Sequence, residues 1–345
     1  MVLFTASQYF SPIILRDIIE SPQVYDATAD YLHWRTYGIF FSFLCVMFRA
    51  YYVGITQTKI LTINSVVMLL SNVVLNYCLI FGKGGFPVMG IAGAAIASSV
   101  SEAVSLLFFI IYTGTTADKR KYGFRRAFTF RPHLLKGMLS ISGWTMVQSF
   151  ISVSIWFIFF LAIEHLGERP LAVTNIVRNI SALLIMVISA FATTAGALIS
   201  NQIGAGEQRY LFRTCGMTLN LTYAILVPLL VILCLFPEPV LRVFTDNPSL
   251  IAASINSVYV MSTSTLIMAP AFILFNAVSG TGNTKAGFIM EMISLTVYTA
   301  AVYYIVIRLK PDVALCWFSE HVYGIALIAL AWWYLKSGKW RGKKV

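Results

Sequence analysis

The sequence predicts an all-α integral membrane protein, and three observations support that prediction. Of its 345 residues, 58% are hydrophobic and only 11% are charged, whereas soluble domains carry about a quarter charged residues. Its mean hydropathy is +0.78. The apolar runs between polar breaks are also long enough for α-helices that cross a bilayer, which need roughly 20 residues each. Lipid is therefore the expected solvent for most of the chain.

The polar breaks between the apolar runs contain glycine and proline, as loops do. They leave nine predicted spans, and residues 1–14 add a partial helix before the first of them. The predicted spans are 30–55, 59–82, 88–115, 137–163, 170–200, 209–236, 248–279, 285–308 and 314–335.

The basic residues are distributed unequally between the two sides of the predicted bundle. Assigning the loops alternately places sixteen Lys and Arg residues on one side and seven on the other, with Arg35 among the seven. Because cytoplasmic loops carry the excess of basic residues, the first side is predicted to be cytoplasmic. The basic segment 118–136 lies on that side, where anionic lipid explains its composition. We therefore expect a multi-pass protein of the cytoplasmic (inner) membrane, with the lipid bilayer and no nucleic acid as its partner.

The chain contains an internal repeat at an offset of 226 residues. Its copies have the same sense across the membrane, because the matched lysines both fall on the cytoplasmic side. Such parallel repeats are typical of secondary transporters, which build a central site between two similar bundles. Among the matched pairs are Pro22 with Pro248, Gly54 with Gly280, and Lys59 with Lys285.

The repeat predicts how the chain is organised. The partner of residues 117–226 would end just before residue 1, so we expect a complete protein with about 110 more N-terminal residues and two parallel six-helix bundles. Whether a fragment or a misassigned start site accounts for this stays open. The predicted parts are an incomplete N-terminal bundle (1–117), a basic cytoplasmic linker (118–136) and a C-terminal six-helix bundle (137–345).

Motifs of enzymes and metal sites are weak in this sequence. Gly204-Ala205-Gly206 lacks the third glycine of a dinucleotide-binding turn and follows a predicted helix rather than a strand. The cysteines and histidines occur singly, without the spacing of a zinc site. We expect no enzyme activity, no metal and no organic cofactor; a membrane-embedded enzyme is the remote alternative.

Ionisable residues inside predicted spans carry the functional hypothesis, because unpaired charge in lipid is costly. Arg49, Glu102, Arg178 and Glu291 are such residues. For Glu102, Arg178 and Glu291 two readings stay open: a role in binding substrate or proton, and a structural ion pair or hydrogen bond. The candidates for a substrate or cation cavity are Gln148, Ser152, Asn175, Arg178, Asn276, Glu291 and Glu102.

Aromatic residues in the spans are also candidates for the cavity. Trp144, Trp156 and Tyr298 would suit amphipathic cations, which aromatic faces attract. The alternative for each is packing or contact with lipid.

Several motifs resemble the multidrug and toxic compound extrusion (MATE) family of secondary transporters. The stretch FGKGGFPVMGIAGAAIA (81–97) is similar to the family's loop between its fifth and sixth helices. SNQIGAGE (200–207) resembles its loop between the eighth and ninth helices, and GTGNT (280–284) its turn between the tenth and eleventh. AVTN (172–175) resembles the start of its eighth helix. The resemblance covers essentially the whole chain.

The resemblance implies a cation-coupled antiporter, driven by Na+ or H+, that exports amphipathic small molecules, and we expect a monomer. The chain departs from the family at the coupling positions: Ser152 and Met268 stand where some members have carboxylates in helices seven and ten. An aspartate that others have in helix one is not present in this chain. No coupling residue can therefore be transferred. The alternative within the wider superfamily is a flippase for lipid-linked saccharides, which would favour an arginine-rich cavity.

Overall fold

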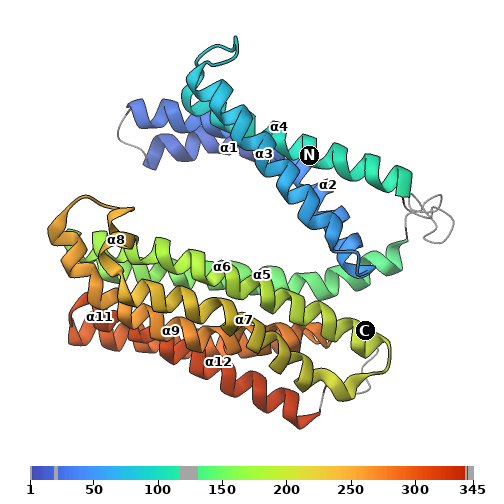
Figure 1. Ribbon diagram of the computed structural model, residues 1–345, viewed down its shortest axis with the longest axis vertical. Coiled ribbons are helices and arrows are strands. Elements are labelled where there is room, and N and C mark those ends of the chain that lie inside the picture. The colour runs from blue at the N-terminus through green and yellow to red at the C-terminus, as the bar shows by residue number, and fades with distance from the viewer. Residues whose placement is uncertain (1, 19–21, 117–130, 339, 341–345) are drawn as a thin grey trace. The chain divides into compact units, whose positions relative to one another are not determined.

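The computed structural model describes residues 2–18, 22–116, 131–338 and 340, and the regular elements among them are helices (Figure 1). The chain divides into two compact units, Met1–Thr129 and Phe130–Val345. That division lies within the segment 118–136 predicted as a linker, most of which falls outside the described residues. Each unit is described separately below.

The predicted fold class is confirmed: nine helices among the described residues are long and apolar enough to cross a membrane. Large apolar side chains stand exposed along them, such as Phe150 and Met186, as expected where lipid is the solvent. The first unit contains α1 (Val2–Ile18), α2 (Pro22–Gly54), α3 (Lys59–Phe81) and α4 (Gly90–Thr116). The second contains α5 (Pro132–Glu164), α6 (Glu168–Gly204), η2 (Gln208–Tyr210), α7 (Leu211–Leu235), α8 (Pro237–Arg242), α9 (Pro248–Gly280), α10 (Thr284–Val302), the π-helix η3 (Tyr303–Leu309), α11 (Val313–Cys316) and α12 (Phe318–Ser337).

Some helix boundaries differ from the predicted ones. The stub predicted at residues 1–14 extends to Ile18, with Pro12 inside the helix. Helix α2 begins at Pro22 rather than near residue 30. Hydropathy locates the part of a helix that lies in lipid, whereas backbone hydrogen bonding continues into polar sequence, and proline suits the first turn. Consequently Arg35, counted above with the outer loop charges, lies well inside a helix.

Local sequence fixes the ends of several helices. The side chain of Asn247 accepts a hydrogen bond from the backbone N–H of Ser249 at 3.0 Å, and Pro248 follows as the first helical residue of α9. Asp312 caps α11 in the same way, accepting from the N–H of Val313 at 2.8 Å. Helix α3 ends at Gly82, which takes the left-handed conformation (φ 64°) that glycine adopts without strain.

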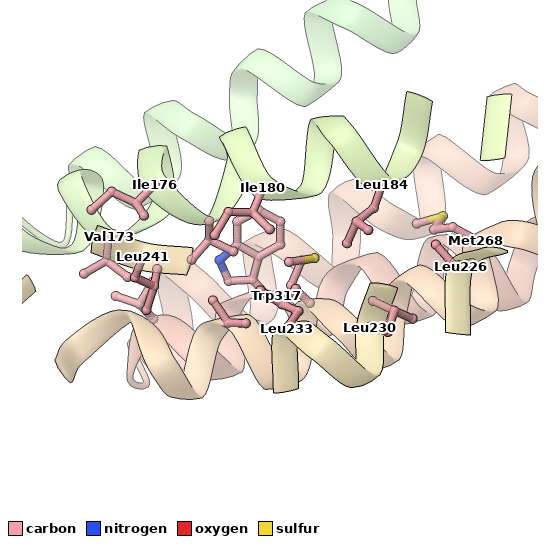
Figure 2. Packing of buried hydrophobic residues seen from close by; sticks show 14 of the residues in the cluster. Val173, Ile176, Ile180, Leu184, Leu226, Leu230, Leu233, Leu241, Met268 and Trp317 are labelled. Atoms are coloured by element: carbon pink, nitrogen blue, oxygen red, sulfur yellow. The ribbon is translucent and has the colours of Figure 1, made fainter. Parts of the chain in front are cut away.

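Apolar side chains from α6, α7, α8, α9 and α11, together with Trp317, form the main core of the second unit. Val173, Ile176, Ile180 and Leu184 of α6 face Leu226, Leu230 and Leu233 of α7, with Met268 of α9 beside them (Figure 2). Helices α6 and α9 cross closely, because a Cβ atom at Gly280 would collide with the carbonyl oxygen of Gly196. This crossing fixes the two long helices that flank the candidate site described below.

The first unit is held together by α4, which packs against both α2 and α3. Phe109 of α4 is fully buried and stacks on Phe48 of α2, with ring centroids 5.5 Å apart. Asn64 of α3 donates to the hydroxyl of Ser105 on α4 at 2.8 Å, which satisfies both buried groups.

The internal repeat is visible in the helix boundaries of the two units. Helices α2 and α9 each have 33 residues, and the offset of 226 places Pro22 on Pro248 at their starts and Gly54 on Gly280 at their ends. Within each unit the packing partners also correspond: α2 and α3 pack on α4, as α9 and α10 pack on α12. Whether the two copies share one sense across the membrane stays a prediction.

Candidate ligand and cation site

A cavity of about 390 Å³ lies in the second unit, lined by residues of α5, α6, α9, α10 and α12. Two acidic residues, Glu291 of α10 and Glu320 of α12, border it. The rest of the lining is mainly apolar and includes four large aromatic side chains. These are Trp156, Phe272, Tyr298 and Tyr323.

Glu291 is held from two neighbouring helices. It is buried, with 4% of its surface exposed. The hydroxyl of Ser152 on α5 donates to Glu291 Oε1 at 2.9 Å, and the hydroxyl of Tyr323 on α12 donates to the same oxygen at 2.9 Å. Within the described part of the chain, Oε2 receives no hydrogen bond. One oxygen is thus anchored, and the other is available to a proton, a cation or a ligand.

Glu320 has a matching environment. Tyr298 of α10 donates from its hydroxyl to Glu320 Oε1 at 3.0 Å, and the rings of Tyr298 and Tyr323 meet edge to face with centroids 5.8 Å apart. Helices α10 and α12 therefore exchange two carboxyl–tyrosine hydrogen bonds, one in each direction. With both carboxyls ionised, the wall of the cavity carries two negative charges and would attract cations.

A second pocket, of about 590 Å³, adjoins the first and shares Trp156, Ile185 and Glu320 with it. Arg178 of α6 borders this pocket. Its guanidinium carbon lies 5.1 Å from the ring centroid of Phe160 and 5.7 Å from that of Trp156. The contacts of Arg178 are therefore with aromatic rings, at cation–π distance, rather than with an acid, since the described residues provide no ion pair for it.

The structure brings together some of the predicted cavity residues and not others. Ser152 and Glu291 are in contact, and the aromatics Trp156 and Tyr298 line the same cavity. Arg178 lines the second pocket, whereas Gln148, Asn175, Asn276 and Trp144 line neither of the two. The backbone carbonyl of Gln148 lies 2.9 Å from the Ser152 hydroxyl and is the alternative acceptor to Glu291 for its single proton. Asn276 donates to the carbonyl of Phe272 in its own helix. Asn175 lies one turn before Arg178, and Trp144 packs against Phe288.

Glu102 lies in the first unit and has a structural partner. Its carboxylate receives two hydrogen bonds from the guanidinium of Arg35, at 2.6 and 3.0 Å. Of the two readings offered above for Glu102, the ion pair is the one that its geometry supports. Gly38 makes room for it, because a Cβ atom there would collide with Arg35 Nη1.

Sequence reasoning missed Glu320, although it lies inside the predicted span 314–335. A usable signal was present: Glu320 and Tyr323 lie one turn apart on one helix, and Glu291 and Tyr298 lie two turns apart on another. Residues three, four or seven apart share a helix face. Two apolar helices that each present a carboxyl and a phenol on one face are suited to pair with each other.

The long apolar helices define a multi-pass membrane protein, and its second unit contains a cavity that combines acidic and aromatic groups. The family-wide sequence model named MatE matches residues 1–78 and 145–305. Because this is more than half of the chain, the protein belongs to the MatE family, whose members are transporters and not enzymes.

Curated relatives support the assignment. The chain is 26% identical over 286 residues to the probable multidrug resistance protein NorM of Thermotoga maritima, covering 79% of this chain and 59% of that protein. It is 25% identical over 268 residues to the uncharacterized transporter YisQ of Bacillus subtilis, covering 74% of this chain and 56% of that protein. The chain thus spans less than two thirds of the length of these relatives.

Solved structures share the fold at low sequence identity. A MOP superfamily transporter from Pyrococcus furiosus matches with a TM-score of 0.85 and 16% identity, covering 97% of this chain and 76% of that one. The Vibrio cholerae MATE transporter VcmN matches with a TM-score of 0.84 and 12% identity, covering 98% of this chain and 76% of that one. The resemblance expected from the loop motifs is confirmed.

Proposed function

We propose that the protein exports amphipathic organic compounds in exchange for a monovalent cation, Na+ or H+, and that Glu291 carries the exchange. The observation that carries the proposal is the position of Glu291: a buried carboxyl on a membrane-spanning helix, beside a cavity, with one oxygen unbonded. Ionisable groups inside membrane spans are costly, and functional sites are where they are usually found. The relatives carrying the name multidrug resistance protein support the same assignment.

The walls of the cavity favour an amphipathic cation as the exported compound. A volume of about 390 Å³ suits a small organic molecule. Trp156, Phe272, Tyr298 and Tyr323 offer apolar area and aromatic faces, which attract cations. Glu291 and Glu320 add negative charge to the lining when they are ionised.

Exchange follows from competition for one group. The free oxygen of Glu291 can hold a proton, a Na+ ion or the basic group of a substrate, and any of these displaces the others. A ligand and a coupling ion that cannot occupy one site together have opposed affinities, as reciprocal linkage requires. This competition is the minimum that an antiporter needs.

The family resemblance adds a second line of support. It places carboxylates of some members at the positions of Ser152 and Met268, on α5 and α9. Both residues line the same cavity as Glu291 and Glu320. We infer that this chain supplies the acidic groups from α10 and α12 instead, close to the same place.

A flippase for lipid-linked saccharides is the second candidate function. The observation that favours it is the pocket of Arg178, since arginine binds phosphate well. Against it, the two acidic residues that line the aromatic cavity, Glu291 and Glu320, favour the export of cationic compounds.

The experiment compares Glu291→Gln with the unmodified protein in proteoliposomes loaded with a fluorescent amphipathic cation. We expect an inward Na+ gradient or an inward H+ gradient to drive efflux, and Glu291→Gln to abolish it while dye binding persists through the aromatic walls and Glu320. If H+ is the ion, transport by the unmodified protein depends on pH; Glu320, Tyr298 and Tyr323 also face this site and are held constant.

The matched control is Glu164→Gln, the same substitution at the exposed end of α5. It should leave efflux unchanged. Full gradient-driven efflux in Glu291→Gln would overturn the proposal. A loss of thermal stability in that variant, with the ion dependence of its residual transport unchanged, would assign Glu291 a structural role instead.

A further inference from the structure

We propose that the pocket at Arg178 is an anion subsite, which binds the carboxylate or phosphate group of ligands whose basic, aromatic part occupies the Glu291 cavity. The proposal deepens the proposed function, on which it rests. It makes the preferred substrates zwitterionic rather than purely cationic.

Arg178 is a charged group without a protein counterion. No ion pair or hydrogen bond from the guanidinium to the described residues is present, and its Nε atom is buried without a partner. The guanidinium instead faces the rings of Phe160 and Trp156. Cation–π contacts do not use the N–H groups of the guanidinium, which stay free to donate. An oxyanion is the group that can receive two such hydrogen bonds side by side.

Two further polar side chains of α6 border the same pocket. Asn179 follows Arg178, and Ser181 lies one turn further along the helix. Neither side chain makes a hydrogen bond to any described residue. Arg178, Asn179 and Ser181 together offer amide, hydroxyl and guanidinium donors on one stretch of a membrane-spanning helix. Unsatisfied donors at membrane depth are destabilising unless a ligand or water receives their hydrogen bonds.

Glu320 does not neutralise Arg178, although both border this pocket. Its Oε1 accepts from Tyr298, and the ion pair that the described residues form is the one between Arg35 and Glu102 in the other unit. Arg178 and Glu320 therefore border one pocket without forming an ion pair, and Trp156, Ile185 and Glu320 are common to both pockets. A ligand with an acidic and a basic group on one aromatic frame matches this arrangement.

The test uses two rhodamine dyes that differ in one group: one carries a free benzoate and is a zwitterion, and the other is its methyl ester and a plain cation. Binding to the detergent-solubilised chain is followed by fluorescence polarisation. We expect Arg178→Gln to weaken binding of the free acid by about tenfold or more, the usual scale for a charged hydrogen bond. Binding of the ester should change little, which also shows that the variant is folded.

Two matched variants sharpen the result. Arg178→Lys keeps the charge but loses the planar pair of donors. Its affinity for the free acid should therefore lie between that of the unmodified protein and that of Arg178→Gln. Arg169→Gln is the same substitution at an exposed position of α6, where the arginine makes one long contact to the carbonyl of Ser249 (3.4 Å), and should change neither affinity. Equal weakening of both dyes by Arg178→Gln, or no weakening of the acid, would overturn the proposal.

The oxyanion could belong to a soluble ligand or to a lipid headgroup, and a third arm separates them. The binding measurement is repeated in nanodiscs with and without phosphatidylglycerol. If lipid phosphate occupies the subsite, phosphatidylglycerol should abolish the preference for the free acid over the ester. If soluble ligands occupy it, the preference should be the same in both nanodiscs. Failure of the ester to bind the unmodified protein would count against the proposed function alone, because the effect of Arg178→Gln on the acid is measured independently.

Discussion

The hydroxyl of Tyr298 on α10 lies 3.0 Å from Glu320 Oε1 on α12, and this is the hydrogen bond by which the protein holds that carboxyl. The neighbouring carboxyl, Glu291, is held by two, from Ser152 and Tyr323. The two acids of the cavity are thus anchored unequally, and the difference can be measured.

Removing each phenol in turn should reveal that inequality. Tyr298→Phe leaves Glu320 without its protein hydrogen bond, and we expect a loss of about 1.5–3 kcal/mol of stability, the range for hydrogen bonds to charged groups. Tyr323→Phe leaves Glu291 its bond from Ser152, so the loss should be smaller. Tyr303→Phe, at an exposed position of η3, is the control. Thermal unfolding in detergent measures the three losses of stability, which should be largest for Tyr298→Phe and smallest for Tyr303→Phe. Equal losses in the three variants would contradict this order.

The pair Arg35–Glu102 should be structural. Arg35 is 32% exposed and Glu102 is 15% exposed, so the pair lies between a weak surface ion pair and a costly buried one. We expect Glu102→Gln to lower stability by about 1–3 kcal/mol. The dependence of transport on Na+ or H+ should be unchanged in proteoliposomes. A change in ion dependence without loss of stability would instead give Glu102 a role in coupling. Glu168→Gln, in the exposed first turn of α6, is the control.

The space left by Gly38 offers an independent test of that ion pair. A methyl group there would overlap the Arg35 guanidinium and lie close to Glu102. We expect Gly38→Ala to destabilise the protein by about 1–3 kcal/mol, as overpacking does. Gly114→Ala, in the helix α4 where nothing lies within 4 Å of the added atom, should be neutral or stabilising. Two variants of equal stability would show that α2 and α4 separate easily.

The predicted orientation can be tested by labelling. Single cysteines would be placed in exposed loops of a variant lacking the five native cysteines. An impermeant thiol reagent applied from outside should label positions 83 and 246, and not positions 57 and 207. Labelling of the second pair from outside would reverse the assignment.

Hydropathy and span length predicted the class of protein and the nine spans, because lipid imposes the same requirement on every helix. The repeat was predicted from residue matches at one offset. Hydropathy and span length did not predict which side chains meet. Arg35 was assigned to a loop because it lies near the polar end of its predicted span. In the structure it lies well inside α2, which begins at Pro22, and its guanidinium reaches Glu102 on α4.

Glu320 was missed for a related reason. It lies near the start of α12, where the sequence alone suggests an exposed helix end. Its burial beside Tyr298 depends on how α12 packs against α10. Likewise Asn276, a plausible cavity residue by composition, satisfies its amide on its own helix. Periodicity identifies which residues share a face of a helix, but tertiary packing determines which side chains of a neighbouring helix they contact.

A single atom, Glu291 Oε1, receives hydrogen bonds from α5 and from α12 while belonging to α10. Hydrogen bonds to an ionised oxygen are roughly twice as strong as those to a neutral one. The charge on the Glu291 carboxyl therefore affects the strength of both hydrogen bonds, which join α10 to α5 and to α12. Neutralising this carboxyl should therefore weaken the connections of α10 to α5 and to α12 at the same time.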